Sequence, residues 1–491
     1  MSEVPLSTPA TTGVLFVDMD GTLIATDLFA ESILAAMKQD PAVLLRMPFW
    51  AGKGRAYFKR QVAERVRPDV RSLPLRPEVL DFIAEERQRG RRIVLATASD
   101  MMWAREVADQ LGLFDDVIAS DGVRNLKGSA KLVALEEYCR EHGFERFDYV
   151  GDAPADLPIW IRTEHALAVA PSAKLRRALV KSGVSSREFG IRGSQLKTLL
   201  KLIRPKQWVK NLLLFVPLIM AHGITDLHKL LACCLAFVTF SLCASSVYVV
   251  NDLLDVNADR VHPKKRFRPF AAGTVPVLYG PPLAVLLFVS GLAIAFAFLP
   301  WRYGVVLLGY YGLSSAYSFW LKRKVMVDVV LLASLYAIRI LAGGLAAEVP
   351  ASDWLIAFSL FIFTSLAFAK RYAELRRLSD KGDHEHASGR GYMTSDLRTM
   401  EMMGTASGFL AVLVLVLYIQ HDKVKVLYPN SKALWFLCPL FLYWVGRLWI
   451  MAGRGEMQED PVAFTIRDRK SLVIGGLAAI ILWLASLNFQ W

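Results

Sequence analysis

Two kinds of hydrophobic pattern follow one another along the chain. Up to about residue 200, short apolar runs alternate with amphipathic stretches, and three of these runs end in acidic, hydroxyl or glycine residues: GVLFVDMDGTL, RRIVLATAS and FDYVGDAPAD. Strands that alternate with helices predict a parallel sheet with helices on both faces. From about residue 208 onward, apolar runs recur with a length of about 20 residues, which a helix needs to cross a bilayer.

This change of pattern divides the chain into two predicted domains. Residues 1–195 are expected to form an α/β, Rossmann-like domain, and residues 196–491 an all-α domain that crosses a membrane several times. Within the first domain, the helical stretch 28–75 separates the first two predicted strands. Because such folds bind ligands at the carboxyl ends of their strands, we expect this insert to be a cap over that edge.

The second domain contains nine apolar stretches, which predict nine transmembrane helices. They lie near residues 208–224, 229–250, 279–299, 303–321, 326–346, 354–371, 404–420, 433–452 and 472–490. The first 20 residues lack a basic start followed by a long apolar core, so we expect the N-terminal domain to stay in the cytoplasm. The loops on that side then carry several times as many Lys and Arg residues as the outer loops. We therefore expect a multi-pass protein of a bacterial-type inner (plasma) membrane, with both domains working on the cytoplasmic side.

Composition and charge narrow the possible functions. Apolar residues make up 54% of the 491 residues and charged residues 21%. Together with the repeated apolar runs of about 20 residues, this composition excludes a fully soluble enzyme and a disordered chain. The formal net charge of +13 indicates either nucleic-acid binding, or basic cytoplasmic loops together with sites for anionic substrates. The distribution of the basic residues favours the second explanation. We expect the lipid bilayer and anionic ligands as partners, and no nucleic acid.

The first candidate site follows the first predicted strand. Asp18 and Asp20 lie on the same side of an extended chain, and Gly21 permits the turn that follows. A carboxylate at the strand end can attack phosphorus, and a second carboxyl group can protonate the leaving oxygen. A simple Asp-Gly turn is the alternative. Asp27 is expected to cap the following helix rather than to bind a ligand.

Three further motifs favour phosphoryl chemistry over a simple turn. Thr97 follows the second apolar run, where its hydroxyl can hold a phosphate oxygen. Lys127 can neutralise a developing phosphoryl oxyanion, and Lys131 is the second candidate for this role. Asp152 and Asp156 follow another strand, and their carboxylates can complete a Mg²⁺ site with the first aspartate pair.

This ordered set of motifs, over residues 13–180, resembles the haloacid dehalogenase (HAD) phosphatase superfamily and its phosphoserine-phosphatase-like branch. The resemblance implies a covalent aspartyl-phosphate on Asp18, with Asp20 as general acid and base. It also implies that Thr97 and Lys127 hold the phosphoryl group. The candidate ligands of Mg²⁺ in this domain are Asp18, Asp20, Asp152 and Asp156.

The second candidate site lies where the second apolar stretch ends. Its four oxygen-bearing side chains recur at helical spacing and would share one flank of a helix: Asn251, Asp252, Asp255 and Asp259. Acidic groups beside a membrane span repel one another without cations, and hard oxygen ligands suit a Mg²⁺ ion shared with a pyrophosphate. A solvated acidic helix face is the alternative.

The pattern N-D-x-x-D-x-x-x-D, the nine spans and their topology resemble the UbiA superfamily of intramembrane prenyltransferases over residues 200–491. The resemblance implies a diphosphate substrate bound through Mg²⁺, with Asp252 and Asp255 as catalytic residues. UbiA enzymes usually carry a second aspartate repeat, and this chain departs from that pattern. The equivalent loop reads Lys370-Arg371-Tyr372-Ala373-Glu374, which indicates a clamp for phosphate groups.

This departure, with the segments RPKQWVKN and DVNADRVHPKKRFRPFAAG, makes the second domain similar to the phosphoribosyltransferase branch that acts on decaprenyl phosphate. That similarity implies phosphoribosyl pyrophosphate (PRPP) as donor and decaprenyl (polyprenyl) phosphate as acceptor. The candidate substrate-binding residues are Lys206, Lys210, Tyr248, Asn251, Lys264, Lys265, Arg266, Arg268, Arg339, Lys370, Arg371, Tyr372 and Glu374. Positive-inside topology accounts for part of the basic set, and the two tyrosines could equally be membrane-belt residues. Arg339 either faces the cavity or pairs with Asp328.

The two resemblances together imply two consecutive reactions that both use Mg²⁺. The transferase would attach 5-phosphoribose to polyprenyl phosphate, and the HAD domain would remove the 5-phosphate to give decaprenylphosphoryl ribose for cell-envelope arabinose. The alternatives are a UbiA prenyltransferase that joins a prenyl diphosphate to an aromatic or lipid acceptor, a transporter or scaffold regulated by the phosphatase domain, and a HAD domain that only binds its ligand. The sequence is compatible with an oligomer.

Overall fold

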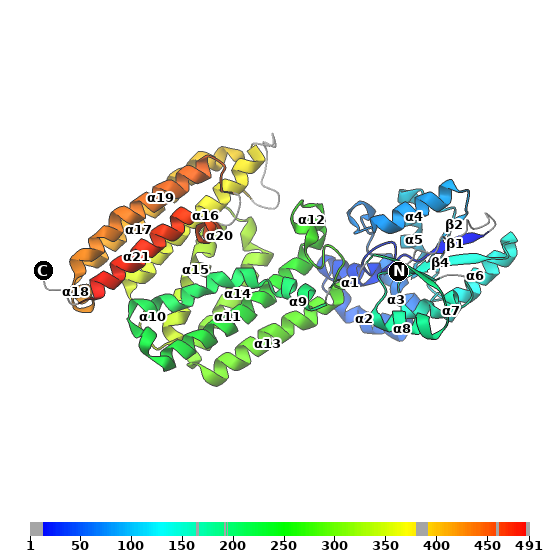
Figure 1. Ribbon diagram of the computed structural model, residues 1–491, viewed down its shortest axis with the longest axis horizontal. Coiled ribbons are helices and arrows are strands. Elements are labelled where there is room, and N and C mark those ends of the chain that lie inside the picture. Colours follow the sequence, from blue (N-terminus) through cyan, green and yellow to red (C-terminus); the bar gives the residue numbers. More distant parts are fainter. Residues whose placement is uncertain are drawn as a thin grey trace, which may run out of the picture. The chain divides into compact units, whose positions relative to one another are not determined.

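The computed structural model describes residues 13–163, 166–190, 193, 195–379, 391–457 and 461–487. The chain divides into two compact units (Figure 1). The first unit comprises Met1–Ile203 and Val249–Leu283, and the second comprises Arg204–Tyr248 and Ala284–Trp491. The segment that carries the acidic motif therefore belongs to the same compact unit as the N-terminal α/β fold.

A six-stranded parallel sheet forms the centre of the first unit. Its strand order is β3-β2-β1-β4-β5-β6, and every neighbouring pair is parallel. The strands are β1 (Val14–Val17), β2 (Ile93–Asp100), β3 (Asp116–Ser120), β4 (Phe147–Gly151), β5 (Ala166–Val169) and β6 (Ser186–Phe189). The three apolar runs singled out in the sequence are β1, β2 and β4, so the predicted parallel α/β sheet is confirmed.

Both faces of this sheet are buried, which explains why its strands are apolar at successive positions. Leu15 and Val17 of β1 pack into one core, whereas Val14 and Phe16 pack into the core on the opposite face. The first core is covered by α4 (Pro77–Gln88) and α5 (Met101–Leu111), and the second by α6 (Ser129–His142), α7 (Leu157–Trp160) and α8 (Ala173–Lys181).

The insert between β1 and β2 is helical, as the sequence predicts. It contains α1 (Leu28–Gln39), α2 (Val43–Gly52), α3 (Arg55–Ala63) and the short 3₁₀ helix η1 (Val70–Ser72). Asp27 accepts a hydrogen bond from the Ala30 amide at 3.0 Å, which confirms its predicted role as the cap of α1. Lys59 of α3 donates to the Ala98 carbonyl, so the insert reaches the carboxyl end of β2.

Short elements complete the first unit. They are η2 (Pro154–Asp156), α9 (Gln195–Ile203), α12 (Val256–Val261), η5 (Lys265–Phe267) and η6 (Val277–Tyr279). Helix α11 (Leu227–Leu254) begins in the second unit and ends in the first. The acidic motif therefore begins in the last turn of a long apolar helix and continues into α12.

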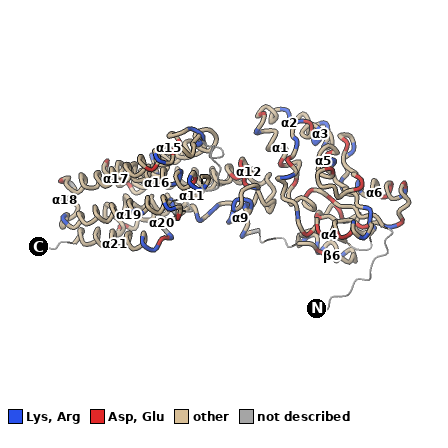
Figure 2. Tube along the Cα trace, turned by 90° about the horizontal axis from the view of Figure 1, so that it is seen from above, with Lys and Arg blue, Asp and Glu red and all other residues tan. Residues whose placement is uncertain are grey.

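The second unit is helical throughout its described part. Helix α13 (Gly280–Phe298) begins at the end of the first unit and continues into the second. The other longer helices of the second unit are α14 (Trp301–Phe319), α15 (Val327–Ala346), α16 (Asp353–Ser379), α17 (Leu397–Gln420), α19 (Leu437–Gly453) and α21 (Arg469–Ser486). Its shorter elements are η3 (Pro205–Phe215), α10 (Val216–Met220), η4 (Gly223–Thr225), η7 (Leu321–Arg323), η8 (Thr394–Asp396), α18 (Asp422–Leu427), η9 (Ser431–Phe436) and α20 (Pro461–Arg467). Figure 2 shows that α17, α19 and α21 carry few charged residues along most of their length.

Seven helical segments in the described part of the chain are long and apolar enough to cross a membrane. They are Leu227–Leu254, Val277–Phe298, Val327–Ala346, Asp353–Ser379, Thr394–Gln420, Ser431–Gly453 and Arg469–Ser486. Each corresponds to one of the nine predicted spans. The predicted span 208–224 is divided between η3 and α10, with Pro217, which has no amide hydrogen, at the start of α10. The predicted span 303–321 is a helix, α14, whose tyrosine, serine and arginine residues lower its mean hydropathy.

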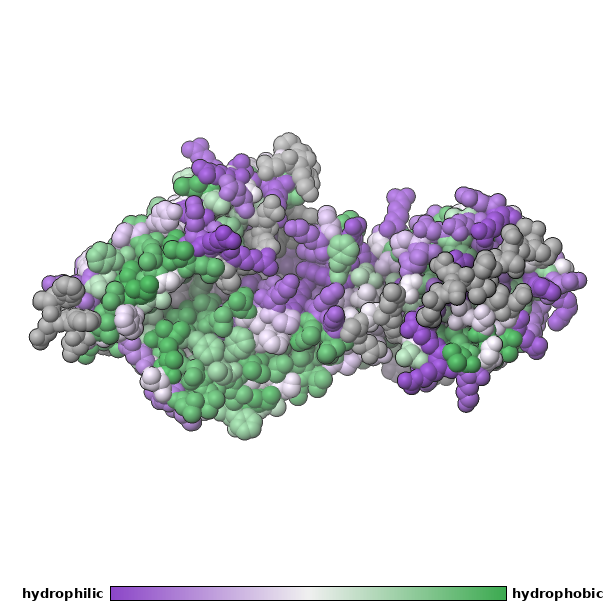
Figure 3. Space-filling model, in the orientation of Figure 1, coloured by the Kyte–Doolittle hydropathy of each residue, from purple (hydrophilic) through white to green (hydrophobic). Residues whose placement is uncertain are grey.

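The surface of the second unit is apolar where it would meet lipid. Figure 3 shows a broad apolar surface over this unit on the face in view. Large apolar side chains of α13 are exposed: Phe298 is 73% exposed and Leu286 65%. Exposed apolar areas of this extent mark a membrane or partner surface rather than a solvated one.

One close helix contact in the second unit predicts a strong stability effect. A Cβ atom on Gly343 of α15 would clash with the Leu214 carbonyl of η3. We expect Gly343→Ala to lower the free energy of unfolding by about 1–3 kcal/mol, because the packed backbone of η3 must shift. Gly446→Ala in α19 is the matched control, since a Cβ there meets nothing within 4 Å. Thermal unfolding in detergent measures both; equal midpoints for the two variants would contradict the expectation.

Candidate active sites

The first site lies at the carboxyl ends of β1 and β4. Asp18 follows β1 and is 7% exposed, and its amide donates to the Val150 carbonyl of β4. Gly21 has φ +82°, and a Cβ there would clash with the Asp152 carboxylate. Glycine is therefore required at this position both for the turn and for the close approach of the second aspartate motif.

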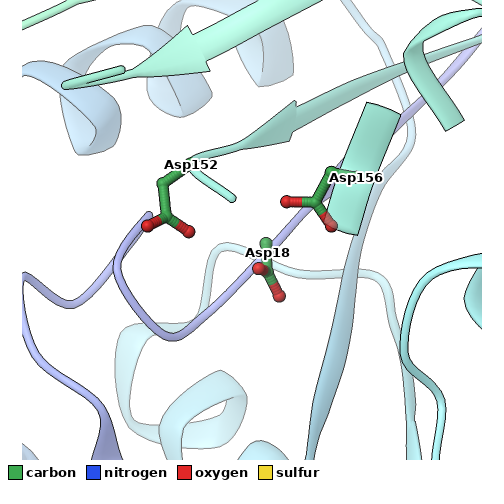
Figure 4. A group of neighbouring side chains, drawn as sticks. All are labelled: Asp18, Asp152 and Asp156. Atoms are coloured by element: carbon green, nitrogen blue, oxygen red, sulfur yellow. The ribbon is translucent and has the colours of Figure 1, made fainter. Parts of the chain in front are cut away.

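Three carboxylates converge at this edge of the sheet, as Figure 4 shows. One ligand oxygen from each of Asp18, Asp152 and Asp156 lies within 4.8 Å of the others. Asp152 follows β4 and Asp156 ends η2, so the sheet and the turn after it bring the sequence motifs together. Three carboxylate oxygens at such distances fit a hard divalent cation such as Mg²⁺. In the described part of the chain, this is the only trio of acidic, histidine or cysteine ligands so grouped.

A buried lysine contacts the same carboxylates. The Lys131 ammonium donates to Asp18 Oδ1 at 2.9 Å and to the Tyr149 hydroxyl at 2.7 Å, and lies 3.8 Å from Asp156 Oδ1. Tyr149 in turn donates to Asp156 at 3.1 Å. Lys127, the first candidate from the sequence, is exposed in the loop before α6. The structure thus brings the second candidate, Lys131, to Asp18, the predicted nucleophile.

The other predicted residues of this site also lie close by. Asp20 accepts hydrogen bonds from the Leu28 amide at 2.8 Å and from the Ser99 hydroxyl at 2.5 Å. The Thr97 hydroxyl is buried in β2 and accepts from the Ser99 amide at 3.0 Å. Ser99 was not singled out in the sequence, although its place two residues after Thr97 on the same strand was a usable signal.

A second lysine that sequence reasoning missed comes from the cap. The Lys59 ammonium donates to the Ala98 carbonyl at 2.5 Å and to Asn125 Oδ1 at 3.1 Å. Burial lowers the pKa of Lys59, and the nearby charges of Asp20 and Asp27 oppose that shift. No sequence pattern connected this helical lysine with the strand ends, because the contact depends on how the cap folds back.

Burial governs the electrostatics of the site. It raises the pKa of Asp18 to about 6, although the Lys131 charge acts in the opposite direction. Burial, together with neighbouring carboxylates, also raises the pKa values of Asp20 and Asp152 to about 7. A divalent cation would favour the charged forms of the clustered carboxylates. Asp20, with a raised pKa and no place in the trio, is suited to donate and accept a proton near neutral pH.

The acidic motif of the second site is almost one continuous helix. Asp255 separates α11 from α12 with φ −98° and ψ 9°. The amides of Asp255 and Asp259 still donate to the carbonyls four residues earlier, at 3.0 Å and 2.8 Å. The predicted helical spacing of the motif is therefore preserved across the junction.

Arg268 contacts two of these acids. Its Nη1 lies 3.2 Å from Asp252 Oδ1 and 2.5 Å from Asp259 Oδ2, and both aspartates are 2% exposed. A guanidinium group thus supplies positive charge where the sequence predicted a cation. The other motif residues, Asn251 and Asp255, are half-buried, whereas the predicted basic residues of the following loop are exposed: Lys264, Lys265 and Arg266.

Within the second unit, Arg339 lies in a buried aromatic and polar environment. Its Nε donates to Asn211 Oδ1 at 2.9 Å, and its Nη2 donates to the Tyr310 hydroxyl at 3.1 Å. Its guanidinium also lies 5.5 Å from the Tyr336 ring centre, and the Lys210 ammonium lies 5.6 Å from the same ring. Two predicted phosphate-binding cations therefore meet at one tyrosine.

Arg371 is held by a different network. It donates to Asp328 at 2.5 Å, to Glu374 at 2.7 Å and to the Tyr317 hydroxyl at 2.7 Å, and it is 1% exposed. Tyr392 also donates to Asp328. The alternative in which Asp328 pairs with Arg339 is therefore wrong, because α16 rather than α15 supplies its partner.

The remaining predicted residues of the second unit are spread along its helices. Lys206 is exposed in η3. The prediction that Lys370 to Glu374 form a loop is wrong, because helix α16 continues through these residues to Ser379, and Lys370 is half-buried in it. Tyr372 is buried with its ring 5.8 Å from that of Trp449. Tyr248 is half-buried, and the Arg204 guanidinium lies 5.4 Å from its ring centre.

Comparison with known proteins agrees with both parts of the chain. Residues 212–466 match the UbiA prenyltransferase family, and residues 15–160 match the haloacid dehalogenase-like hydrolases. Protein y4nM of Sinorhizobium fredii is 36% identical over 95% of this chain and 89% of its own length. Nodulation protein NoeC of Azorhizobium caulinodans is 36% identical over 57% of this chain and 91% of its own length.

A third relative matches about half of the chain. Decaprenyl-phosphate phosphoribosyltransferase of Mycobacterium tuberculosis is 36% identical over 55% of this chain and 87% of its own length. The y4nM match spans both parts, so the fusion of a hydrolase fold to a transferase fold is shared with a relative. The apolar helices and the match to the UbiA family both indicate a multi-pass membrane enzyme. The chain belongs to the UbiA prenyltransferase family and carries a HAD-like phosphatase domain in its N-terminal part.

Proposed function

We propose that this protein transfers 5-phosphoribose from PRPP to decaprenyl (polyprenyl) phosphate and then removes the ribose 5-phosphate. The observation that carries the proposal is the pairing of the two folds in one chain, which is 36% identical over 55% of its length to a decaprenyl-phosphate phosphoribosyltransferase. The product of such a transferase keeps a phosphate monoester, which is the substrate class of a HAD phosphatase. The final product would be decaprenylphosphoryl ribose, a precursor of cell-envelope arabinose.

In the transfer step, pyrophosphate leaves ribose C1 and a phosphate oxygen of the lipid forms the new bond to C1. Asn251, Asp252, Asp255 and Asp259 are the proposed ligands of Mg²⁺, which when bound would stabilise the charge that develops on the pyrophosphate. Arg268 already contacts Asp252 and Asp259, so it is placed to neutralise these acids or to contact the leaving group. The apolar helices would hold the polyprenyl tail and exclude water from C1.

The phosphate groups of both substrates require cations. We propose Lys206, Lys210, Lys264, Lys265, Arg266, Arg268, Arg339 and Lys370 as the residues that contact them, with Tyr248 and Tyr372 near ribose or phosphate. Arg371 is engaged with Asp328 and Glu374, so its proposed part is to hold helix α16 in position beside Lys370. Arg339 and Lys210, which meet at Tyr336, are the best-supported pair among these cations.

In the second step, Asp18 attacks phosphorus and the bond from phosphorus to the ribose O5 breaks. Asp20 gives its proton to that oxygen, and the phosphoryl group is carried on Asp18. A water molecule then attacks phosphorus while Asp20 takes up a proton, which releases phosphate and restores Asp18. Lys131 and Thr97 hold the phosphoryl oxygens, and Asp18, Asp152 and Asp156 would bind Mg²⁺, which supplies further charge stabilisation.

The position of the lysine makes a prediction that separates the two candidates. We expect Lys131→Gln to lower kcat for a soluble phosphomonoester by about 10²–10³, as removal of one donor to a developing oxyanion does. Lys127→Gln, which changes an exposed side chain, is expected to leave kcat within about threefold. Steady-state kinetics on both full-length variants measure this. The reverse order of effects would reassign the role to Lys127.

The proposed arrangement in the membrane follows the charge pattern of the loops. We propose nine spans in a bacterial-type inner membrane, with η3–α10 and α14 added to the seven apolar segments, and both active sites on the cytoplasmic side. The proposed functional boundary lies at residues 195 and 196. Tethering the two activities raises the effective concentration of the phosphatase near the transferase product.

The test is a reconstituted reaction with two donors. Purified protein with Mg²⁺, polyprenyl phosphate and PRPP is expected to form a ribosylated lipid, detected by mass spectrometry. A parallel reaction contains a prenyl diphosphate and an aromatic acceptor. Consumption of the prenyl diphosphate, with no ribosylated lipid in the first reaction, would replace the proposal by ordinary UbiA prenyl transfer.

A further inference from the structure

A buried ion pair joins the phosphatase cap to the segment that carries the acidic motif. Arg260, in the last turn of α12, donates to Glu31, in the first turn of α1, through both terminal nitrogens at 2.9 Å and 2.5 Å. The two side chains are 5% and 12% exposed. A bidentate pair with so little solvent contact fixes both distance and orientation, unlike a surface salt bridge.

Two further contacts within the first unit hold the same segment against the cap. Lys38, near the end of α1, donates to the Leu254 carbonyl at the end of α11, at 3.0 Å. Gly273 has φ +67°, and a Cβ there would lie 2.8 Å from the Ala25 carbonyl, just before α1. The segment 249–283 therefore contacts the cap near both ends of α1 and in the residues that precede this helix. Figures 1 and 2 show α12 beside α1.

The same helix α1 also contacts the catalytic acid of the phosphatase. The amide of Leu28, its first residue, donates to Asp20 Oδ1 at 2.8 Å, one turn before Glu31. On the other side of the ion pair, Arg260 directly follows Asp259 in the sequence, and Asp259 forms a salt bridge with Arg268. A continuous series of hydrogen bonds and ion pairs thus runs from Asp20 through α1 and Arg260 to the acidic motif.

We propose that phosphatase activity depends on the segment 249–283. Arg260 is a positioning residue that holds α1 in place, and α1 in turn holds the acid Asp20 in its catalytic position. The phosphatase fold and the membrane-exit segment of the transferase then act as one unit, and displacement of the segment weakens phosphate-ester hydrolysis. This inference rests on the phosphatase activity proposed above. The coupling arises because Glu31 and Leu28 belong to the same rigid helix. A shift of α1 at Glu31 therefore also moves the Leu28 amide that donates to Asp20.

The first test is charge reversal in the full-length protein. Arg260→Glu and Glu31→Arg are each expected to lower kcat/KM for a soluble phosphomonoester by about tenfold or more, because each variant places two like charges at a buried contact. The double variant, which exchanges the charges, is expected to recover most of this loss. Recovery is incomplete because Arg260 also donates to the Ala271 carbonyl at 3.1 Å. Arg176→Glu breaks the exposed pair with Glu188 in the same unit and is the matched control.

The second test measures the conformational stability of the cap and does not depend on enzymatic activity. Hydrogen exchange of peptides from residues 28–39 is expected to be faster in Arg260→Glu than in wild type, and slower again in the double variant, with residues 176–189 unchanged. Asp18→Asn carrying the same changes should behave alike, because exchange does not need turnover. Unchanged exchange in the cap would overturn the inference. If the cap responds but no variant, wild type included, hydrolyses a phosphomonoester, the proposed function fails and the docking stands.

Discussion

The Asp18→Asn variant is expected to carry out the phosphoribosyl transfer but not the removal of the 5-phosphate. A lipid product one phosphoryl group heavier than the wild-type product should therefore accumulate. The asparagine amide cannot form the acyl-phosphate, and removal of a catalytic nucleophile lowers turnover by at least about a thousandfold. The transferase motif is unchanged in this variant. Mass spectrometry of the extracted lipids, after incubation with polyprenyl phosphate, PRPP and Mg²⁺, measures both products in one experiment.

The matched control is Asp81→Asn, which removes one carboxylate from the exposed face of α4. It is expected to give the wild-type product. Accumulation of the heavier lipid in Asp18→Asn alone would establish both reactions and their order. Identical products from Asp18→Asn and wild type would show that this carboxylate does not act on the lipid. Hydrolysis of free phosphomonoesters without any action on the lipid product would separate the two activities.

The strands and the convergence of the aspartates could be predicted because they depend on local patterns. A buried parallel strand must be apolar at successive positions, as β1 and β4 are, and its carboxyl end lies at the edge where ligands bind. The sequence therefore predicts that Asp18 and Asp152 lie at one edge of the sheet, and the structure brings them together. Asp27 was identified as a cap in the same way, from its position before a helix.

The choice between Lys127 and Lys131 could not be made from the sequence. Lys131 lies in the first turn of α6 on the side that faces the sheet, whereas Lys127 lies in the loop before it. A shift of a few residues in the start of the helix would have exchanged the two. Lys59 was missed for a related reason, since its approach to Asn125 depends on the fold of the cap.

The partners of the buried charged residues in the second unit also could not be predicted from the sequence. Asp328 and Arg339 lie in one predicted span, eleven positions apart at a spacing that a helix can align, which made their pairing a reasonable alternative. The structure instead joins Asp328 to Arg371 of α16, and Arg339 to Asn211 of η3. Arg371 lies 43 residues from Asp328 on the next helix, and Asn211 lies 128 residues from Arg339. Only the packing of the bundle decides between these partners.

Asp252→Asn is expected to abolish phosphoribosyl transfer while hydrolysis of a soluble phosphomonoester continues. The substitution keeps the shape of the side chain but removes a buried charge that contacts Arg268 at 3.2 Å. It therefore weakens both the proposed Mg²⁺ site and the placement of the guanidinium beside the leaving pyrophosphate. A loss of at least about 10²–10³ in kcat is expected, the size found when one electrostatic contact to developing charge is removed.

Asp226→Asn provides the matched control for this change. Asp226 precedes the other end of α11, is exposed, and accepts hydrogen bonds from the amides of His228 and Lys229. Asparagine can accept the same bonds, so folding and transfer should be retained. Transfer of radiolabelled ribose from PRPP to the lipid measures the effect at several Mg²⁺ concentrations, and Asp255→Asn is assayed beside it. If both Asp252→Asn and Asp255→Asn retain transfer at wild-type rates, the acidic motif is not the metal site, and Arg268 alone neutralises these acids.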